Sequence, residues 1–444
     1  QHEGKGALMK IGLFYELQLP RPYDGDSWEP DAEHRVYKEA LEQIELADKL
    51  GMDYVFEVEH HHLEEYAHSS APEILLAAAS QRTKNIRLGH GIVLTPPLYN
   101  HPGRIAERVS ALDLVSDGRV EFGSGESSTE MELGAYHVPW DEKKAMWEEG
   151  LRVTLRMMTE QPFTGIDGQY VKFPARNVIP KPLQKPHPPL WVAGGRRETV
   201  LTAARLGMGS LGFSFETPEE ADERVATYWR VMREECRPIG KAVNPALCIL
   251  SQFACAETED EAIRRAGDGG QFFSFSAGHH YNPTGGRDHQ PGKTNLYRQF
   301  RDMPEDARLA MLAARRGEAA PTAAGGAQPE LDQLEQLAKT EALLAQREPE
   351  NETARGLWRA ARGRASIGTP EQLRDYLRGY EDAHQDVMLL MAQCGTRKHE
   401  DIMASIDLFG RTVLPDISER HETVHKKWRE QQLDEFRYPV NSSV

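Results

Sequence analysis

The feature that most constrains this chain is a repeated alternation of short apolar segments with longer amphipathic ones. Runs such as Ile11–Tyr15 and Val120–Gly123 are typical of strands buried on both faces of a sheet. The longer segments place apolar residues at helical spacing, as Ile105, Val109 and Leu112 do. The predicted strands are 11–15, 54–58, 86–94, 120–123, 190–193, 210–213, 247–256 and 386–391. Eight strand-then-helix units predict a closed (β/α)8 TIM barrel, with an open doubly wound sheet as the alternative.

Composition excludes several classes of protein. Of the 444 residues, 27% are charged and 39% are hydrophobic, which is ordinary for a globular chain. The net charge of −16 argues against nucleic acid or an anionic membrane as the main partner. No apolar run reaches the roughly 18 residues of a membrane-spanning helix. The four cysteines form no CxxC pair, so we expect no zinc ribbon and no disulfide framework. This cysteine usage favours a reducing, cytoplasmic setting.

The expected organisation is a single barrel domain over residues 9–444. Residues 1–8 are interpreted as a leader or an added remnant, because Met9 opens a typical natural start. Residues 268–364, from Asp268 to Arg364, lie between the seventh and eighth predicted strands and show no clear strand. Long loops of a barrel's C-terminal face are often functional. We interpret this stretch as an insertion on that face, either a substrate lid or a surface or dimer elaboration.

The residues that follow each predicted strand are the site candidates, because barrel active sites lie at the carboxyl ends of the strands. His60 follows the second strand, and an imidazole there can hold and return a proton near neutral pH. The alternative is a surface histidine, or a core histidine bonded to backbone. We expect no metal at His60, His61 and His62, because successive extended residues point to opposite faces and no HExxH pattern occurs.

Glycine-rich segments are candidates for holding a cofactor. Gly194-Gly195-Arg196-Arg197 precedes a predicted helix, where free N–H groups and positive side chains suit a phosphate. The alternative is a plain turn with two solvated arginines. Gly123–Ser128 lacks the third glycine of a dinucleotide fingerprint, but its hydroxyls and glycines suit a cofactor. Gly91 allows a flat ring to approach the backbone, permits a strained peptide, or only relieves crowding in the barrel wall.

Taken in order, these segments resemble the bacterial luciferase-like family of flavin-dependent monooxygenases. The resemblance covers nearly the whole chain except residues 268–364. The matching segments are Met9–Phe14, Gly51–Phe56, Glu59–His61, Ile86–Leu94, His101–Pro102, Arg104–Glu107, Gly118–Gly123, Pro189–Gly195, Gly368–Glu371, Ser405–Phe409 and Val413–Pro415.

The resemblance implies a barrel that binds FMN, often as a homodimer, with His60 as the catalytic histidine. It also implies a non-proline cis peptide at Gly91–Ile92, behind the flavin ring. Glu126 stands where many members carry arginine, a charge that Arg196 and Arg197 are expected to replace. The residues implied to hold the cofactor are Glu59, Gly91, Ile92, Glu126, Ser127, Ser128, Ala193, Gly194, Gly195, Arg196 and Arg197.

The implied activity is that of the oxygenase component of a two-component system. An NAD(P)H:flavin reductase would supply reduced FMN, which reacts with O2 through a C4a-(hydro)peroxyflavin and oxygenates a small organic substrate. The chain has no nicotinamide fingerprint of its own. The alternatives are an F420-dependent oxidoreductase, a non-catalytic flavin-binding protein, and a metal-dependent hydrolase. The hydrolase would need His60, His62 or His279 and His280 to converge with a carboxylate.

Overall fold

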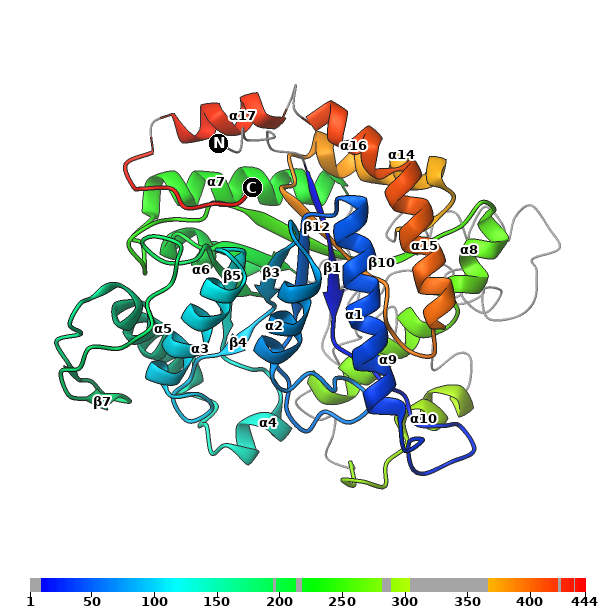
Figure 1. Ribbon diagram of the computed structural model, residues 1–444, viewed down its shortest axis with the longest axis horizontal. Helices are drawn as coiled ribbons and strands as arrows, with labels where there is room; N and C mark the ends of the chain where they lie inside the picture. The colour runs from blue at the N-terminus through cyan, green and yellow to red at the C-terminus, as the bar shows by residue number, and fades with distance from the viewer. Residues whose placement is uncertain are drawn as a thin grey trace, which may run out of the picture.

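The computed structural model describes residues 9–194, 197–212, 218–281, 289–303, 366–421, 425–434 and 436–444. Within these residues, eight parallel strands form a ring (Figure 1). Their order is β1 (Lys10–Tyr15), β2 (Tyr54–Glu57), β3 (Arg87–His90), β5 (Val120–Gly125), β8 (Leu190–Ala193), β9 (Gly209–Gly212), β10 (Leu247–Cys255) and β12 (Val387–Met391). The ring is closed, because β12 pairs with both β1 and β10. The predicted (β/α)8 barrel is therefore confirmed, and the open sheet is excluded.

The main helices follow the strands and surround the barrel (Figure 1). They are α1 (Ala32–Leu50), α2 (Pro72–Arg82), α3 (Pro102–Val115), α5 (Lys143–Thr159), α6 (Arg197–Leu206), α7 (Pro218–Glu235), α14 (Pro370–Asp382) and α15 (His399–Thr412). Shorter elements are α4 (Glu130–Ala135), α8 (Glu259–Ala266), α16 (Leu414–His421), α17 (His425–Leu433), β4 (Val93–Leu94), β6 (Ile166–Asp167), β7 (Lys172–Phe173) and β11 (Ser366–Gly368). No helix of the described chain is long and apolar enough to cross a membrane.

The third predicted strand is divided in two. β3 ends at His90, and β4 pairs only with β5. The Gly91–Ile92 bond between them is trans, because the cis peptide bonds of the described chain all precede proline. The expectation of a cis bond there was wrong. A non-proline cis bond costs about 3–4 kcal/mol, which favours the trans form here.

Alternation along the strands separates two apolar cores. On β1, Leu13 and Tyr15 face the helices, whereas Phe14 joins the core inside the barrel. On β2, Phe56 faces the interior and Val58 continues this series beyond the strand end. Because side chains alternate with a period of two, Glu16 and His60 follow the inward-facing series of neighbouring strands. The strand pattern thus brings these two polar side chains to the same end of the barrel.

Two helices of the predicted insertion are described, α9 (Gly269–Tyr281) and α10 (Leu296–Asp302). Phe273 and Ala277 of α9 pack into the interior core together with Val58 and Met391. These last two residues lie at the carboxyl ends of β2 and β12, so α9 covers that end of the barrel. The Ala/Gly/Pro-rich tract 319–329 lies outside the described residues.

The amino end of the barrel is covered by the C-terminal segment 436–444. Lys10 donates to the Ser443 carbonyl, and the Tyr54 and Ser443 hydroxyls are 2.8 Å apart. Val243 and Val440 form a β-bridge. Since Lys10 opens β1, these contacts close the end of the barrel opposite to His60.

Candidate active site

His60 lies just beyond β2, with its side chain only 13% exposed. Its Nδ1 is 3.0 Å from Oε1 of Glu132, and its Nε2 is 3.1 Å from the hydroxyl of Tyr281. Oε2 of Glu16 lies 3.7 Å from the same Nε2. The ring is therefore neither a surface histidine nor a core histidine bonded to backbone. It stands between side chains from three other parts of the chain.

Glu132 fixes one side of this ring. It lies in α4, is fully buried, and accepts four hydrogen bonds. Oε1 accepts from His60 Nδ1 and from the His61 N–H at 2.9 Å, and Oε2 accepts from Ser127 Oγ at 2.8 Å and Thr129 Oγ1 at 2.7 Å. Burial alone raises the pKa of Glu132, but the charge and hydrogen bond of His60, with the other donors, lower it to about 2. Glu132 is therefore an ionised acceptor.

His60 is held in its protonated form. Burial lowers its pKa, but the charge and hydrogen bond of Glu132, followed by the charges of Glu16 and Glu59, raise it to about 9. In the imidazolium form both ring nitrogens carry protons, so Nδ1 donates to Glu132 and Nε2 donates to the Tyr281 oxygen. The proton on Nε2 is the one that this arrangement can give to a bound molecule.

Tyr281 comes from the predicted insertion, as the last residue of α9. Its ring meets that of His60 edge to face, with centroids 6.2 Å apart. It also contacts Tyr66, with centroids 5.7 Å apart. Sequence reasoning missed Tyr281, because no local pattern relates it to a histidine 221 positions earlier. Glu132 was also missed, since Thr129 and Glu132 have the spacing of an ordinary helix-capping pair.

The loop after β5 is bound by a lysine from the start of α5. Glu126 Oε1 accepts from Lys143 Nζ at 2.8 Å, and the same ammonium donates to the Ser127 carbonyl at 2.8 Å. Ser127 has a left-handed backbone (φ 65°), which turns its hydroxyl onto Glu132. Ser128 is half-buried. Lys143, a residue that sequence reasoning missed, thus places a positive charge beside this loop.

The turn after β8 is described only in part. Ala193 ends β8, and the Gly194 N–H donates to the Leu211 carbonyl at 2.9 Å. Arg197 begins α6, with its side chain 77% exposed and 3.9 Å from Glu223. Gly195 and Arg196 lie outside the described residues. The described half of this turn therefore provides one solvent-facing cation at the start of a helix.

Glu59, implied as a cofactor neighbour by the resemblance, also makes several contacts within the protein. Its carboxylate accepts from the Leu94 N–H at 2.7 Å and from Asn100 Nδ2 at 2.8 Å, and lies 3.0 Å from His61 Nε2. These contacts use both carboxylate oxygens within the protein. In this structure Glu59 ties the end of β2 to the end of β4.

Groups at the carboxyl ends of the strands fit a cofactor with a flat ring and a phosphate. The interior core supplies apolar surface at the strand ends through Val58, Ile92 and Met391. Glu126 Oε2 is buried and lacks a partner within the described chain, as a polar atom facing an absent group would. The start of α6 with Arg197 suits an anion. FMN and F420 both have such a ring and phosphate, so these groups suit either.

Among the described residues, no three histidine, cysteine, aspartate or glutamate side chains are arranged to hold a metal ion. His62 stacks on Tyr136, with centroids 5.7 Å apart. His279 and His280 gather with His289, with ring centroids 5.0 to 5.7 Å apart. The metal-dependent hydrolase alternative therefore lacks a ligand set in this part of the chain.

The comparisons with known proteins point to one family. A family model described as luciferase-like monooxygenase matches residues 9–386. The chain spans about half the length of the curated relatives that it matches at 31% identity. It is 24% identical to the oxygenase component of the flavin-dependent trigonelline monooxygenase of Acinetobacter baylyi, over 60% of this chain and 71% of that protein. It is 30% identical to an F420-dependent glucose-6-phosphate dehydrogenase of Intrasporangium calvum, over 41% of this chain and 55% of that protein.

One solved structure shows the same fold over nearly the whole chain. It is the oxygenating constituent of the 3,6-diketocamphane monooxygenase of Pseudomonas putida, in complex with FMN. The TM-score is 0.63 at 17% identity, covering 92% of this chain and 98% of that chain. At this identity the likeness supports the barrel fold alone.

Proposed function

The chain belongs to the luciferase-like monooxygenase family, and from this premise we propose that it is the oxygenase component of a two-component monooxygenase. It would use reduced FMN and O2 to oxygenate a small organic substrate. The observation that carries the proposal is the buried pair of His60 and Glu132, with Nδ1 and Oε1 3.0 Å apart, at the carboxyl ends of the strands. The relative named above as the oxygenase component of a flavin-dependent monooxygenase supports this choice.

The redox chemistry belongs to the flavin when it is bound, and the chain contributes binding and proton control. Val58, Ile92 and Met391 provide apolar surface that excludes water. Glu132 fixes the orientation and charge of His60, which presents a proton at Nε2. General acid catalysis of this kind contributes roughly 10²- to 10⁴-fold in rate. We propose Glu126, Ser127, Ser128 and the turn at 193–197 as the neighbours of the ribityl and phosphate groups.

Reduced FMN would come from a separate NAD(P)H:flavin reductase, since the sequence holds no nicotinamide fingerprint. We also propose that the chain forms a homodimer and that residues 268–364 are an insertion in a single barrel domain. The second candidate function is F420-dependent hydride transfer, which the relative from Intrasporangium calvum favours.

The test is anaerobic mixing of the protein with reduced FMN, followed by stopped-flow addition of O2 while the flavin absorbance is recorded. We expect flavin bound to the protein to return to the oxidised spectrum more slowly than free reduced FMN. Reoxidation at the rate of free flavin, together with tighter binding of F420 than of FMN in a parallel titration, would overturn the proposal in favour of hydride transfer.

A further inference from the structure

Glu16 is a buried carboxyl group at the site that the proposed function has not yet used. It follows β1 on the inward-facing series and is 1% exposed. Oε1 accepts from the Tyr66 hydroxyl at 3.1 Å. Oε2 has no hydrogen-bond partner within the described residues, and it lies 3.7 Å from His60 Nε2. One half of this carboxyl group is therefore aimed at the proton-bearing atom of the site.

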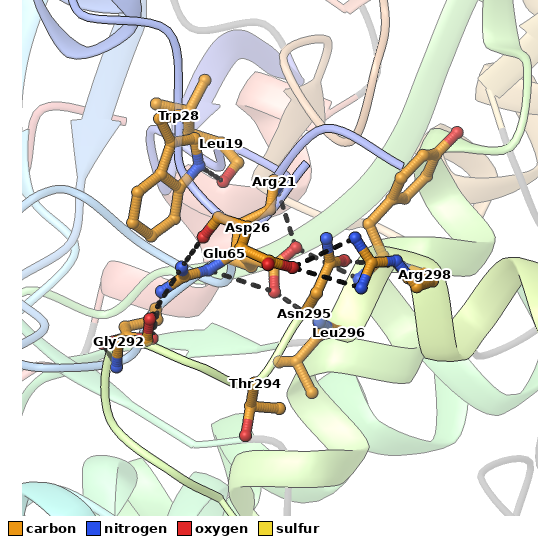
Figure 2. Close-up of polar contacts among 12 residues, drawn as sticks. Leu19, Arg21, Asp26, Trp28, Glu65, Gly292, Thr294, Asn295, Leu296 and Arg298 are labelled. Carbon is orange, nitrogen blue, oxygen red and sulfur yellow. Dashed lines mark hydrogen bonds and ion pairs between the residues drawn. The ribbon is translucent and has the colours of Figure 1, made fainter. Parts of the chain in front are cut away.

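Two other buried carboxylates of the same region, Glu65 and Glu132, are satisfied by several donors. Glu65, also fully buried, accepts from the backbone N–H groups of Arg21 at 2.7 Å, Tyr297 at 3.1 Å, and Leu296 (Figure 2). Glu132 has four donors, as described above. A buried carboxylate with one donor is costly unless it takes up a proton or faces a cation. The difference sets Glu16 apart from Glu65 and Glu132 as a group that can change its protonation state.

The groups that face Glu16 make both of its states accessible. Burial raises its pKa, the charge of His60 and the hydroxyl of Tyr66 lower it, and the charge of Glu132 raises it, to about 7. Tyr281 contacts the same His60 nitrogen from α9. Glu16 is thus poised between carboxylate and carboxylic acid near neutral pH, whereas Glu132 stays ionised.

We propose that Glu16 is the proton-exchange partner of His60. Its carboxylate accepts the Nε2 proton from the imidazolium and later returns it to the neutral ring. The proton leaves Nε2, the imidazolium becomes neutral, and the Glu16 carboxylate becomes a carboxylic acid. Nδ1–H stays on Glu132, and no electron is transferred. Rotation of the Glu16 side chain must shorten the 3.7 Å separation to hydrogen-bond distance for this transfer. Glu16 acts through His60, as a positioning residue for its proton.

Only the link between this exchange and catalysis rests on the proposed function. The exchange itself is a property of the protein without cofactor, so it is measured on the full chain without flavin. The experiment is a pH titration of the full chain carrying ¹⁵N-labelled histidine, with the His60 ring signals assigned by their loss in His60→Gln. We expect two steps in the wild type, one near the pKa of Glu16 at about 7 and one near that of His60 at about 9.

In Glu16→Gln the step near pH 7 should disappear, and the remaining step should move down by about one unit, because a neighbouring negative charge is lost. The matched control is Glu57→Gln. Glu57 is also fully buried with one unpartnered oxygen, but it bonds Ser69 and follows the outward-facing Val55 on β2. This control should keep both steps. A wild-type step near pH 7 that survives in Glu16→Gln, or that Glu57→Gln also removes, would overturn the proposal.

A second variant keeps the test decisive if Glu16→Gln does not fold. Tyr66→Phe removes the hydroxyl that lowers the pKa of Glu16, so the first step should move to higher pH. An unchanged step would overturn the proposal. If the titration gives the expected result while the flavin experiment fails, the monooxygenase function falls and the proton exchange stands.

Discussion

At the scale of single residues, the two carboxyl groups beside His60 differ in how many donors they have. Glu132 accepts four hydrogen bonds, so it remains a fixed negative charge. Glu16 accepts one, from Tyr66. Since the cost of a buried charge depends on its partners, the first group orients the imidazole and the second can exchange protons with it.

Glu132→Gln tests the orienting role. The amide keeps the shape of the side chain but removes the charge that keeps His60 protonated. We expect the pKa of His60 to fall by about one unit or more, and product formation with a flavin reductase to fall about tenfold or more. The control is Glu130→Gln, an exposed carboxyl on the same helix, which should behave as the wild type. Wild-type turnover in Glu132→Gln would remove the pair from the mechanism.

The charge of His60 also predicts how stability depends on pH. Its pKa in the folded chain is about 9, above the ordinary 6.5. The stabilisation is therefore fully present below pH 6.5 and is lost as the pH rises through 9. We expect the difference in free energy of unfolding between the wild type and His60→Gln to shrink over this range, as measured by urea denaturation. A difference that grows with pH would contradict the assignment.

His60 could be predicted from the sequence, because it follows a recognisable strand and barrel chemistry lies at strand ends. Tyr281 and Lys143 could not, since their contacts with the site depend on how distant segments pack. Glu16 carries a weak sequence signal, because it continues the two-residue alternation of β1 beyond the end of the strand. Sequence reasoning did not use this signal. Glu59, which the luciferase-like resemblance implies as a cofactor neighbour, also joins two strand ends in the folded chain.

At the scale of elements, the described part of residues 268–364 is anchored to the loops after β1 and β2. Asn295 Nδ2 donates to the Pro22 and Gly25 carbonyls at 2.8 Å each, and Glu65 caps the start of α10 (Figure 2). These loops lie at the same end of the barrel as His60. The anchoring therefore helps to hold Tyr281 of α9 against the histidine.

Glu65→Gln tests this anchor. The amide oxygen can replace only part of a carboxylate that accepts three backbone N–H groups, so we expect a local loss of about 1–3 kcal/mol. Hydrogen exchange of the Leu296 and Tyr297 amides should quicken accordingly. The control is Glu400→Gln, an exposed carboxyl on α15. Unchanged exchange at both amides would show that Glu65 does not hold α10.

Elements with a clear local code could be predicted closely. The helices α2 and α7 each open with a proline that suits a first helical turn, so the sequence marks where they begin. The strand 86–94 was predicted as continuous, but the chain leaves the β2–β3 ladder after Gly91. That break depends on pairing with β5, which a single segment does not encode.

At the scale of the whole molecule, the barrel is closed at its amino end by a buried ionic network. Asp386, just before β12, is fully buried. It accepts from the Leu247 N–H at 2.8 Å and Arg429 at 2.7 Å, and lies 3.1 Å from His425. The charge of Arg429 and these hydrogen bonds outweigh burial and lower the pKa of Asp386. The network joins three distant parts of the chain.

Asp386→Asn should be strongly destabilising, because it leaves the buried charge of Arg429 without its partner. We expect a loss of about 3–5 kcal/mol in the free energy of unfolding, measured by urea denaturation at neutral pH. Asp382→Asn, at an exposed position on α14, serves as the control and should change stability by less than about 0.5 kcal/mol. Equal effects of the two variants would mean that the network does not stabilise the barrel.

The central claim is that Glu132 keeps His60 protonated at the mouth of the barrel. The most direct measurement is the ¹⁵N spectrum of the His60 ring at about pH 8, between its ordinary pKa of 6.5 and the value of about 9 in this structure. We predict that both ring nitrogens carry protons in the wild type and that about half or more of the rings lose one proton in Glu132→Gln. A neutral His60 ring in the wild type at this pH would contradict the account.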